Sequence, residues 1–225
     1  MIPKISIVGR SNSGKTTLIE KLISELSGRG HRVATVKHDV HGFDIDKEGK
    51  DSWRHKKAGS QLVVISSPSK IAIIKDLEQE QDLEEIRRQW IHDVDIIVTE
   101  GYKRESFPKI EINLFQDPPE FVCSDDDNLI AVVAKVPRRG AVPTFSEGQI
   151  AELSDFIETR FLRSSEKHRV EIWNDSKPIA VEPFMQEVIK KTLHGLLSTL
   201  KGFSADGAVE IRMEGMTEQE KENHR

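Results

Sequence analysis

The sequence predicts an α/β fold: a mainly parallel sheet flanked by helices, with a small ββαβ appendage at its C-terminal end. Apolar runs of strand length alternate with segments of helical period, which is the pattern of βαβ units. After residue 165 the pattern changes to two short strands, a leucine-rich helix and a last strand. We therefore predict a main domain at residues 1–165, the appendage at residues 166–215 and a disordered tail at residues 216–225.

The main domain opens with one complete βαβ unit. Strands are predicted at residues 5–8 and 33–36, and the segment between them carries apolar residues at the spacing of one helix face. Those apolar residues are Leu18, Ile19, Leu22, Ile23 and Leu26. Gly28 and Gly30 end this helix, because glycine commonly stops a helix.

The alternation then continues along the chain. Further strands are predicted at residues 62–65, 71–74, 96–99, 110–114 and 129–133, and further helices at residues 51–58, 83–90 and 150–161. In the appendage, a hairpin of residues 170–172 and 179–181 precedes a helix. That helix begins near Pro183 and ends at Gly202, and residues 209–213 form the last strand.

Composition limits the partners. A net charge of −5 with 32% charged residues argues against a nucleic-acid or anionic-membrane binder. No apolar stretch approaches the roughly 20 residues of a membrane span. The single cysteine, Cys123, cannot form an intrachain disulfide, and the acidic residues that follow it disfavour a thiolate. A reducing cytoplasm is the expected compartment.

The clearest functional signal lies between the first strand and the first helix. Residues 9–16 fit G-x-x-x-x-G-K-[ST], the P-loop or Walker A motif, at every fixed position. In this motif, backbone N–H groups and the positive end of the helix dipole hold phosphate oxygens. The residues expected to bind the nucleotide are Gly9, Ser11, Asn12, Ser13, Gly14, Lys15, Thr16 and Thr17. Residues 1–165 are therefore predicted to be a P-loop nucleotide-binding domain.

Three side chains have individual roles in this prediction. The Lys15 ammonium is expected at the β and γ phosphates, and the Thr16 hydroxyl is expected to coordinate Mg²⁺. A carboxylate is expected at the C-terminal end of a neighbouring strand, where ligands of open α/β sheets bind. Glu100 ends the strand at residues 96–99, whereas Asp95 lies at its start, about 16 Å away at 3.3 Å per residue. We therefore assign this role to Glu100.

The long polar connection at residues 38–57 offers several alternatives. It follows Lys37 at the end of the second strand, and its aspartates are candidate metal ligands: Asp39, Asp44, Asp46 and Asp51. His38 and His41 have a spacing that a transition-metal site could use, although a solvated loop explains them as well. The basic cluster at residues 54–57 is either a solvated helix face or a landing site for an anionic substrate.

Four ordered motifs together resemble the MobB family, the molybdopterin-guanine dinucleotide biosynthesis protein B family. They are residues 9–17, residues 36–39 with His41, residues 49–52 leading to Ala58 and Gly59, and residues 99–103 followed by residues 109–111. The resemblance covers roughly residues 1–165.

The resemblance implies a GTP-binding protein with weak GTPase activity, usually a homodimer. It also implies that the protein assists MobA, the guanylyltransferase that attaches GMP to Mo-molybdopterin. The arrangement is similar to dethiobiotin synthetase as well. That similarity implies that Lys37 serves the phosphates and that Asp51 serves Mg²⁺, with Glu100 as the carboxylate at the strand end. Lys15, Lys37 and Glu100 are thus the candidate catalytic residues, and Thr16, Asp51 and Glu100 are the candidate metal ligands.

Two departures leave questions open. Residues 131–137 contain no aspartate of the Asn-Lys-x-Asp kind that reads guanine, so the guanine preference comes from the resemblance alone. The appendage lies outside the resemblance and is expected to serve packing or dimerisation. The alternative functions are an ATP-dependent small-molecule kinase or ligase, and a metallochaperone GTPase that uses His38 and His41.

Overall fold

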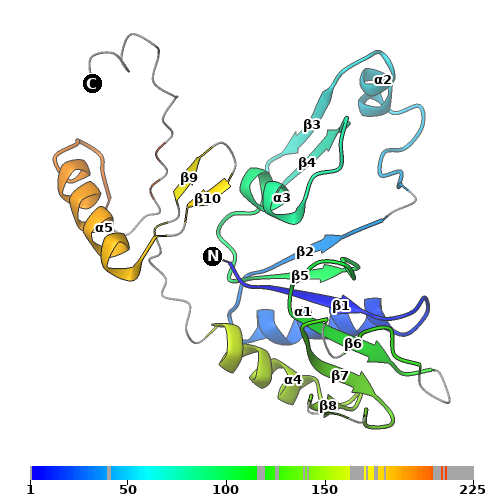
Figure 1. Ribbon diagram of the computed structural model, residues 1–225. Helices are drawn as coiled ribbons and strands as arrows, with labels where there is room; N and C mark the ends of the chain where they lie inside the picture. The colour runs from blue at the N-terminus through cyan, green and yellow to red at the C-terminus, as the bar shows by residue number, and fades with distance from the viewer. Residues whose placement is uncertain are drawn as a thin grey trace. The chain divides into compact units, whose positions relative to one another are not determined.

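The computed structural model describes residues 2–39, 42–115, 120–124, 127–138, 140, 142–162, 170, 172–174, 177–179, 181–204, 209 and 211. The chain divides into two compact units, Met1–Glu166 and Lys167–Arg225. Figure 1 labels their helices and strands.

The first unit is built on a parallel sheet of six strands in the order β2-β5-β1-β6-β7-β8 (Figure 1). The strands are β1 (Lys4–Val8), β2 (Val33–Lys37), β5 (Ile96–Glu100), β6 (Lys109–Asn113), β7 (Leu129–Ala134) and β8 (Thr144–Phe145). Every neighbouring pair is parallel, which confirms the predicted α/β architecture. All strands therefore end at the same edge of the sheet, and β1 ends between β5 and β6.

One face of this sheet carries the hydrophobic core. Helices α1 (Lys15–Gly28) and α4 (Ile150–Ile157) pack on it and contact each other, and a turn of π-helix, Glu158–Leu162, continues α4. Fully buried residues from the strands and from both helices form one cluster, which includes Ile7, Leu22, Ile110, Leu153 and Ile157. Helices cover parallel strands in this way, and β7 accordingly reads as a continuous apolar run, whereas β1 is fully buried but includes the polar residues Lys4 and Ser6.

The opposite face of β6 is polar and still buried. Side chains alternate along a strand, so Ile110 and Ile112 join the core while Lys109, Glu111 and Asn113 point the other way. These three side chains are at most 4% exposed. They hold chain segments against the sheet by hydrogen bonds, because a buried polar group needs a partner.

These side chains bond to backbone groups of loops that run beside the sheet, and Glu111 also lies 3.8 Å from Arg138 Nη1. Lys109 Nζ donates to the carbonyl oxygens of Glu105 at 2.5 Å and Asp127 at 2.8 Å, and Asn113 Nδ2 donates to Glu120 O at 2.9 Å. The Glu111 carboxylate accepts from the N–H groups of Val122 at 2.5 Å and Cys123 at 3.1 Å. Burial, the Glu111 charge and the Asp127 charge raise the pKa of the Cys123 thiol to about 12, so this thiol stays protonated at neutral pH.

Strands β3 (Leu62–Ser67) and β4 (Lys70–Lys75) form a separate antiparallel hairpin. The sequence predicts both strands but does not reveal that they pair only with each other rather than in the main sheet. The two-residue connection between them allows antiparallel pairing and is far too short for a parallel crossover. Helix α2 (Asp51–Lys57) contacts β3, and helix α3 (Leu83–Trp90) begins with a capping box between Asp82 and Glu85.

The second unit contains an antiparallel hairpin and a helix. Strand β9 (Ile172–Asn174) pairs with β10 (Lys177–Ile179), and helix α5 (Pro183–Leu197) has proline in its first turn. The predicted last strand, residues 209–213, lies largely outside the described residues; Val209 and Ile211 are described and are not in a strand. The predicted tail, residues 216–225, lies outside them entirely. No helix in the described parts of the chain is long and apolar enough to cross a membrane.

Replacing Glu111 with glutamine tests the polar face of β6. The amide keeps the volume of the carboxylate but loses its charge and one acceptor oxygen, which leaves a buried N–H group of Val122 or Cys123 without its partner. We expect a loss of about 1–3 kcal/mol in the free energy of unfolding, measured by urea denaturation. The matched control is Glu20→Gln at an exposed position of α1; equal unfolding free energies for the two variants would contradict the anchoring role.

Candidate nucleotide-binding site

The turn between β1 and α1, residues 9–14, has a backbone shape that requires glycine. Gly9 has φ +152° and Gly14 has φ +99°, and Asn12 between them also has a positive φ of 58°. A Cβ atom on Gly9 would lie 2.6 Å from the backbone oxygen of Ile112 in β6. The turn therefore packs directly on the neighbouring strand, and any side chain at position 9 would push it away.

The first turn of α1 carries partial positive charge that no side chain of the helix start compensates. Its N-cap is Gly14, no side chain caps the helix, and no acidic residue lies in the first turn. The leading N–H groups of a helix have no intrahelical partner, and the helix dipole adds partial positive charge there. This end of α1 is therefore suited to an anion.

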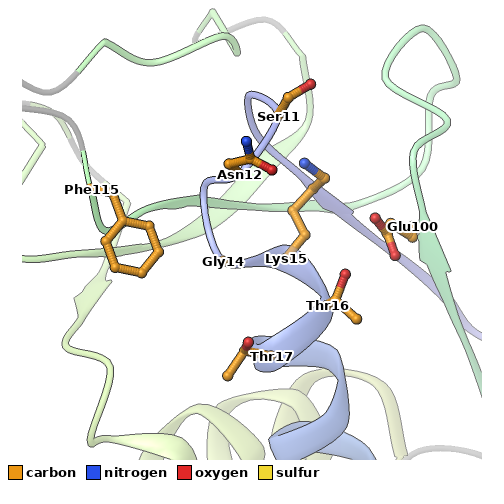
Figure 2. Close-up of a pocket in the computed structure, with 8 residues that line it drawn as sticks. All are labelled: Ser11, Asn12, Gly14, Lys15, Thr16, Thr17, Glu100 and Phe115. Atoms are coloured by element: carbon orange, nitrogen blue, oxygen red, sulfur yellow. The ribbon is translucent and has the colours of Figure 1, made fainter.

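A cavity of about 410 Å³ opens at this helix end (Figure 2). Its wall combines loop residues, the start of α1 and one residue from each side of β1: Ser11, Asn12, Gly14, Lys15, Thr16, Thr17, Glu100 and Phe115. Six of the eight nucleotide-binding residues predicted from the sequence line it. The other two, Gly9 and Ser13, do not line the cavity: Gly9 packs on Ile112, and Ser13 is buried.

Lys15 places its ammonium group at the mouth of the loop. Lys15 Nζ donates to the backbone oxygens of Arg10 at 2.6 Å and Gly9 at 3.4 Å. Partial burial lowers the pKa of Lys15 below its usual range and the positive charge of Lys103 acts in the same direction, whereas the negative charge of Glu100 opposes them. A nearby anion would favour the charged ammonium and offset the cost of its burial.

Glu100 and Asp95 lie at opposite ends of β5. Glu100 is in register with Ile7 of β1 and Lys37 of β2, and its side chain lines the cavity. Asp95 instead accepts hydrogen bonds from the backbone N–H of Arg32 at 2.8 Å and from its guanidinium at 3.1 and 3.3 Å. These bonds lower the pKa of Asp95. The structure thus places Glu100, and not Asp95, beside the loop.

Contacts that the sequence does not reveal fix the chain after Glu100. Gly101 and Tyr102 both have positive φ, 101° and 52°, and the Tyr102 ring stacks on the His38 ring with centroids 4.8 Å apart. His38 Nε2 also lies 2.6 Å from a carboxylate oxygen of Glu80. These partners are distant in sequence, so no local pattern could have identified them.

Lys37 and Asp51 are not among the residues that line the cavity. Lys37 is exposed at the end of β2, and the Asp51 side chain is 89% exposed with Arg54 Nη1 at 3.8 Å. The other loop aspartates, Asp39, Asp44 and Asp46, do not line it either. The roles assigned to Lys37 and Asp51 therefore stay predictions.

The features behind the alternative functions are engaged in local contacts. In α2, Lys56 pairs with Asp76 and Lys57 Nζ lies 4.5 Å from the centroid of the Trp53 ring. His38 is bound to Glu80, and the proposed second ligand, His41, lies outside the described residues. Within the described parts of the chain, no three His, Cys, Asp or Glu side chains gather as a metal site.

A parallel α/β sheet in which a G-x-x-x-x-G-K-[ST] turn, here residues 9–16, joins a central strand to the following helix is characteristic of the P-loop NTPase class. The family model described as "MobB: Molybdopterin guanine dinucleotide synthesis protein B" matches residues 4–135. This chain belongs to the MobB family.

Relatives agree with this assignment. The chain is 37% identical over 158 residues, 70% of its length, to a molybdopterin-guanine dinucleotide biosynthesis adapter protein of Haemophilus influenzae, of which it covers 88%. It is 25% identical over 232 residues to a putative adapter protein of the same name from Methanocaldococcus jannaschii, covering 93% of this chain and 97% of that one. A crystal structure of molybdopterin-guanine biosynthesis protein B superposes with a TM-score of 0.56 and 31% identity, covering 71% of this chain and 99% of that one.

Proposed function

We propose that this protein is a GTP-binding accessory protein with weak GTPase activity that assists the attachment of GMP to molybdopterin. The observation that carries the proposal is the cavity at the start of α1, where an uncapped helix end, the Lys15 ammonium and the Glu100 carboxylate meet. The guanine dinucleotide in the names of the family and of its relatives supports GTP as the nucleotide.

Mg²⁺ fits the donors that this cavity offers. Mg²⁺ prefers oxygen ligands and usually keeps several waters, so it needs few protein groups when a nucleotide supplies phosphate oxygens. The hydroxyl of Thr16 and the carboxylate of Glu100 line the same cavity and are ligands of this kind. We propose that Thr16 binds the ion directly, with Glu100 or Asp51 as the acidic group. When bound, the ion neutralises phosphate charge.

The same cavity supports slow hydrolysis. Fast phosphoryl transfer requires a group that stabilises the charge of the transition state and one that orients the attacking water. Among the described residues that line the cavity there is no arginine or glutamine. Arg10 of the loop is paired with Glu120, and both side chains are about half exposed or more. Catalytic roles are proposed for Lys15 and Glu100, which line the cavity, and for Lys37, which does not line it and whose role rests on the resemblance to dethiobiotin synthetase.

The accessory role follows from the names of the relatives. Proteins named as biosynthesis adapters match most of this chain, which supports a protein that acts beside an enzyme. The proposed partner is a MobA-type molybdopterin guanylyltransferase, with molybdopterin as a further ligand. A homodimer in the cytoplasm is the form that we propose for this function.

Nucleotide capture can be tested with Lys15→Ala. Removing the ammonium should weaken GTP binding about 10- to 150-fold, because a hydrogen bond to a charged group contributes about 1.5–3 kcal/mol. Isothermal titration with GTP, with and without Mg²⁺, measures the effect, and Thr16→Ala should remove most of the Mg²⁺ dependence. Lys21→Ala, at an exposed position nearly two turns further along α1, is the control. If the wild type and Lys15→Ala bind GTP equally, the cavity is not the nucleotide site.

The isolated protein should hydrolyse GTP slowly. Because none of the described residues that line the cavity is an arginine or a glutamine, we expect a turnover well below the roughly 1–100 s⁻¹ of kinases, and closer to the ~10⁻⁴ s⁻¹ of an unassisted small GTPase. Release of inorganic phosphate under saturating GTP measures it, with Lys15→Ala as the background. Turnover in the kinase range, or transfer of phosphate to an added acceptor, would favour the kinase or ligase alternative.

The accessory role predicts a functional partner. Added to a molybdopterin guanylyltransferase with GTP, Mg²⁺ and Mo-molybdopterin, the wild-type protein should increase formation of the guanine dinucleotide cofactor. Lys15→Ala should give no more than the enzyme alone. Product is measured by chromatography of the released cofactor. If the wild type and Lys15→Ala increase cofactor formation equally, the stimulation does not depend on nucleotide binding, which would contradict the proposal.

A further inference from the structure

We propose that Phe115 and Lys135 form the subsite for the purine base of the nucleotide, with Lys135 giving a preference for guanine. The inference rests on the proposed nucleotide-binding function and adds the part of the site that recognises the base. The sequence pattern did not supply this part, because residues 131–137 carry no aspartate for the guanine ring.

Phe115 is an exposed aromatic side chain on the wall of a polar cavity. It is the second residue after β6; Leu114, between the strand and Phe115, is 5% exposed, whereas Phe115 is 66% exposed. Its Cε2 atom lies 3.4 Å from the position that a Cβ on Gly14 would occupy, so the ring borders the phosphate-binding turn itself. An exposed ring face beside a ligand cavity is a surface on which a flat base can stack.

Phe115 lies on the side of the turn that the base must occupy. In the sheet, β5 and β6 flank β1 on opposite sides, so Glu100 and Phe115 form opposite walls of the cavity. Figure 2 shows Lys15, Thr16 and Glu100 on one side of the turn and the Phe115 ring on the other. With the terminal phosphates and Mg²⁺ beside Lys15, Thr16 and Glu100, the nucleoside extends away from Glu100. On that side, the aromatic ring of Phe115 forms part of the cavity wall.

Lys135 supplies the second element of the subsite. It follows β7, the neighbour of β6, and its predecessor Ala134 is 3% exposed, so the backbone at this point is held by the sheet. The Lys135 ammonium lies over the Phe115 ring, 5.9 Å from its centroid, and Lys135 is exposed and does not itself line the cavity. A base that stacks on this face of the ring would displace the ammonium, and the long, solvent-exposed side chain can then reach the edge of that base.

The chemistry of the ammonium group favours guanine over adenine. Lysine offers three donors and no acceptor. Guanine presents two neighbouring acceptors, O6 and N7, whereas adenine presents N7 beside an amino group that can only donate. The Lys135 ammonium can therefore donate to both O6 and N7 of guanine. On adenine it can donate only to N7, and it meets an amino group that also donates. This discrimination needs no carboxylate, and it is weaker than that of an aspartate that binds the opposite edge.

The two side chains should give separable effects. Phe115→Ala should weaken GTP and ATP to the same extent, about tenfold, because stacking does not depend on the base, and Phe115→Trp should retain binding. Lys135→Ala should weaken GTP several-fold more than ATP. Titration calorimetry of each variant with GTP, ATP and inorganic triphosphate, all with Mg²⁺, measures these effects. Phe184→Ala, at a phenylalanine of the second unit that is 76% exposed, is the control.

Inorganic triphosphate separates the base subsite from the phosphate site. If the wild type binds triphosphate as tightly as GTP, or if Phe115→Ala loses triphosphate as much as GTP, the base subsite is wrong while phosphate capture stands. If Lys135→Ala keeps the wild-type ratio of GTP to ATP affinity, its part in guanine preference is wrong. If the wild type binds neither GTP nor triphosphate, the proposed function itself fails.

Discussion

The close packing of the turn at residues 9–14 against β6 is the constraint on which the site depends. Because Ile112 O lies where a side chain of Gly9 would be, only glycine allows β1 to turn at this point and deliver the chain into α1. The parallel register of β5, β1 and β6 then sets the positions of the strand ends around that turn. The cavity therefore results from backbone geometry first and from side-chain chemistry second.

Local signals in the sequence were sufficient for the elements that this geometry uses. The apolar runs located β1, β5, β6 and β7, and the fixed positions of the motif located the turn and the start of α1. Strand length alone placed Glu100, and not Asp95, at the site. The two-residue strand β8 was missed, because it carries too few residues for a pattern.

What the sequence could not give are contacts between distant segments. Whether β3 and β4 join the main sheet depends on which partner each strand finds, and the tie between His38, Tyr102 and Glu80 joins three separate segments. Phe115 belongs to no motif, and its importance appears only when the end of β6 is seen beside Gly14. The roles of Lys37 and Asp51 were inferred from family resemblance. Resemblance gives little information on where the side chains of exposed loop residues lie.

The uncapped start of α1 has a consequence for work with the purified protein. Free amide groups at a helix start bind oxyanions in general, so sulfate, phosphate or citrate in a buffer would compete for the position proposed for the nucleotide phosphates. Such ions would both stabilise the fold and mask weak ligands by mass action. Affinities measured in those buffers are therefore apparent values, and solutions of monovalent chloride and a zwitterionic buffer report the intrinsic ones.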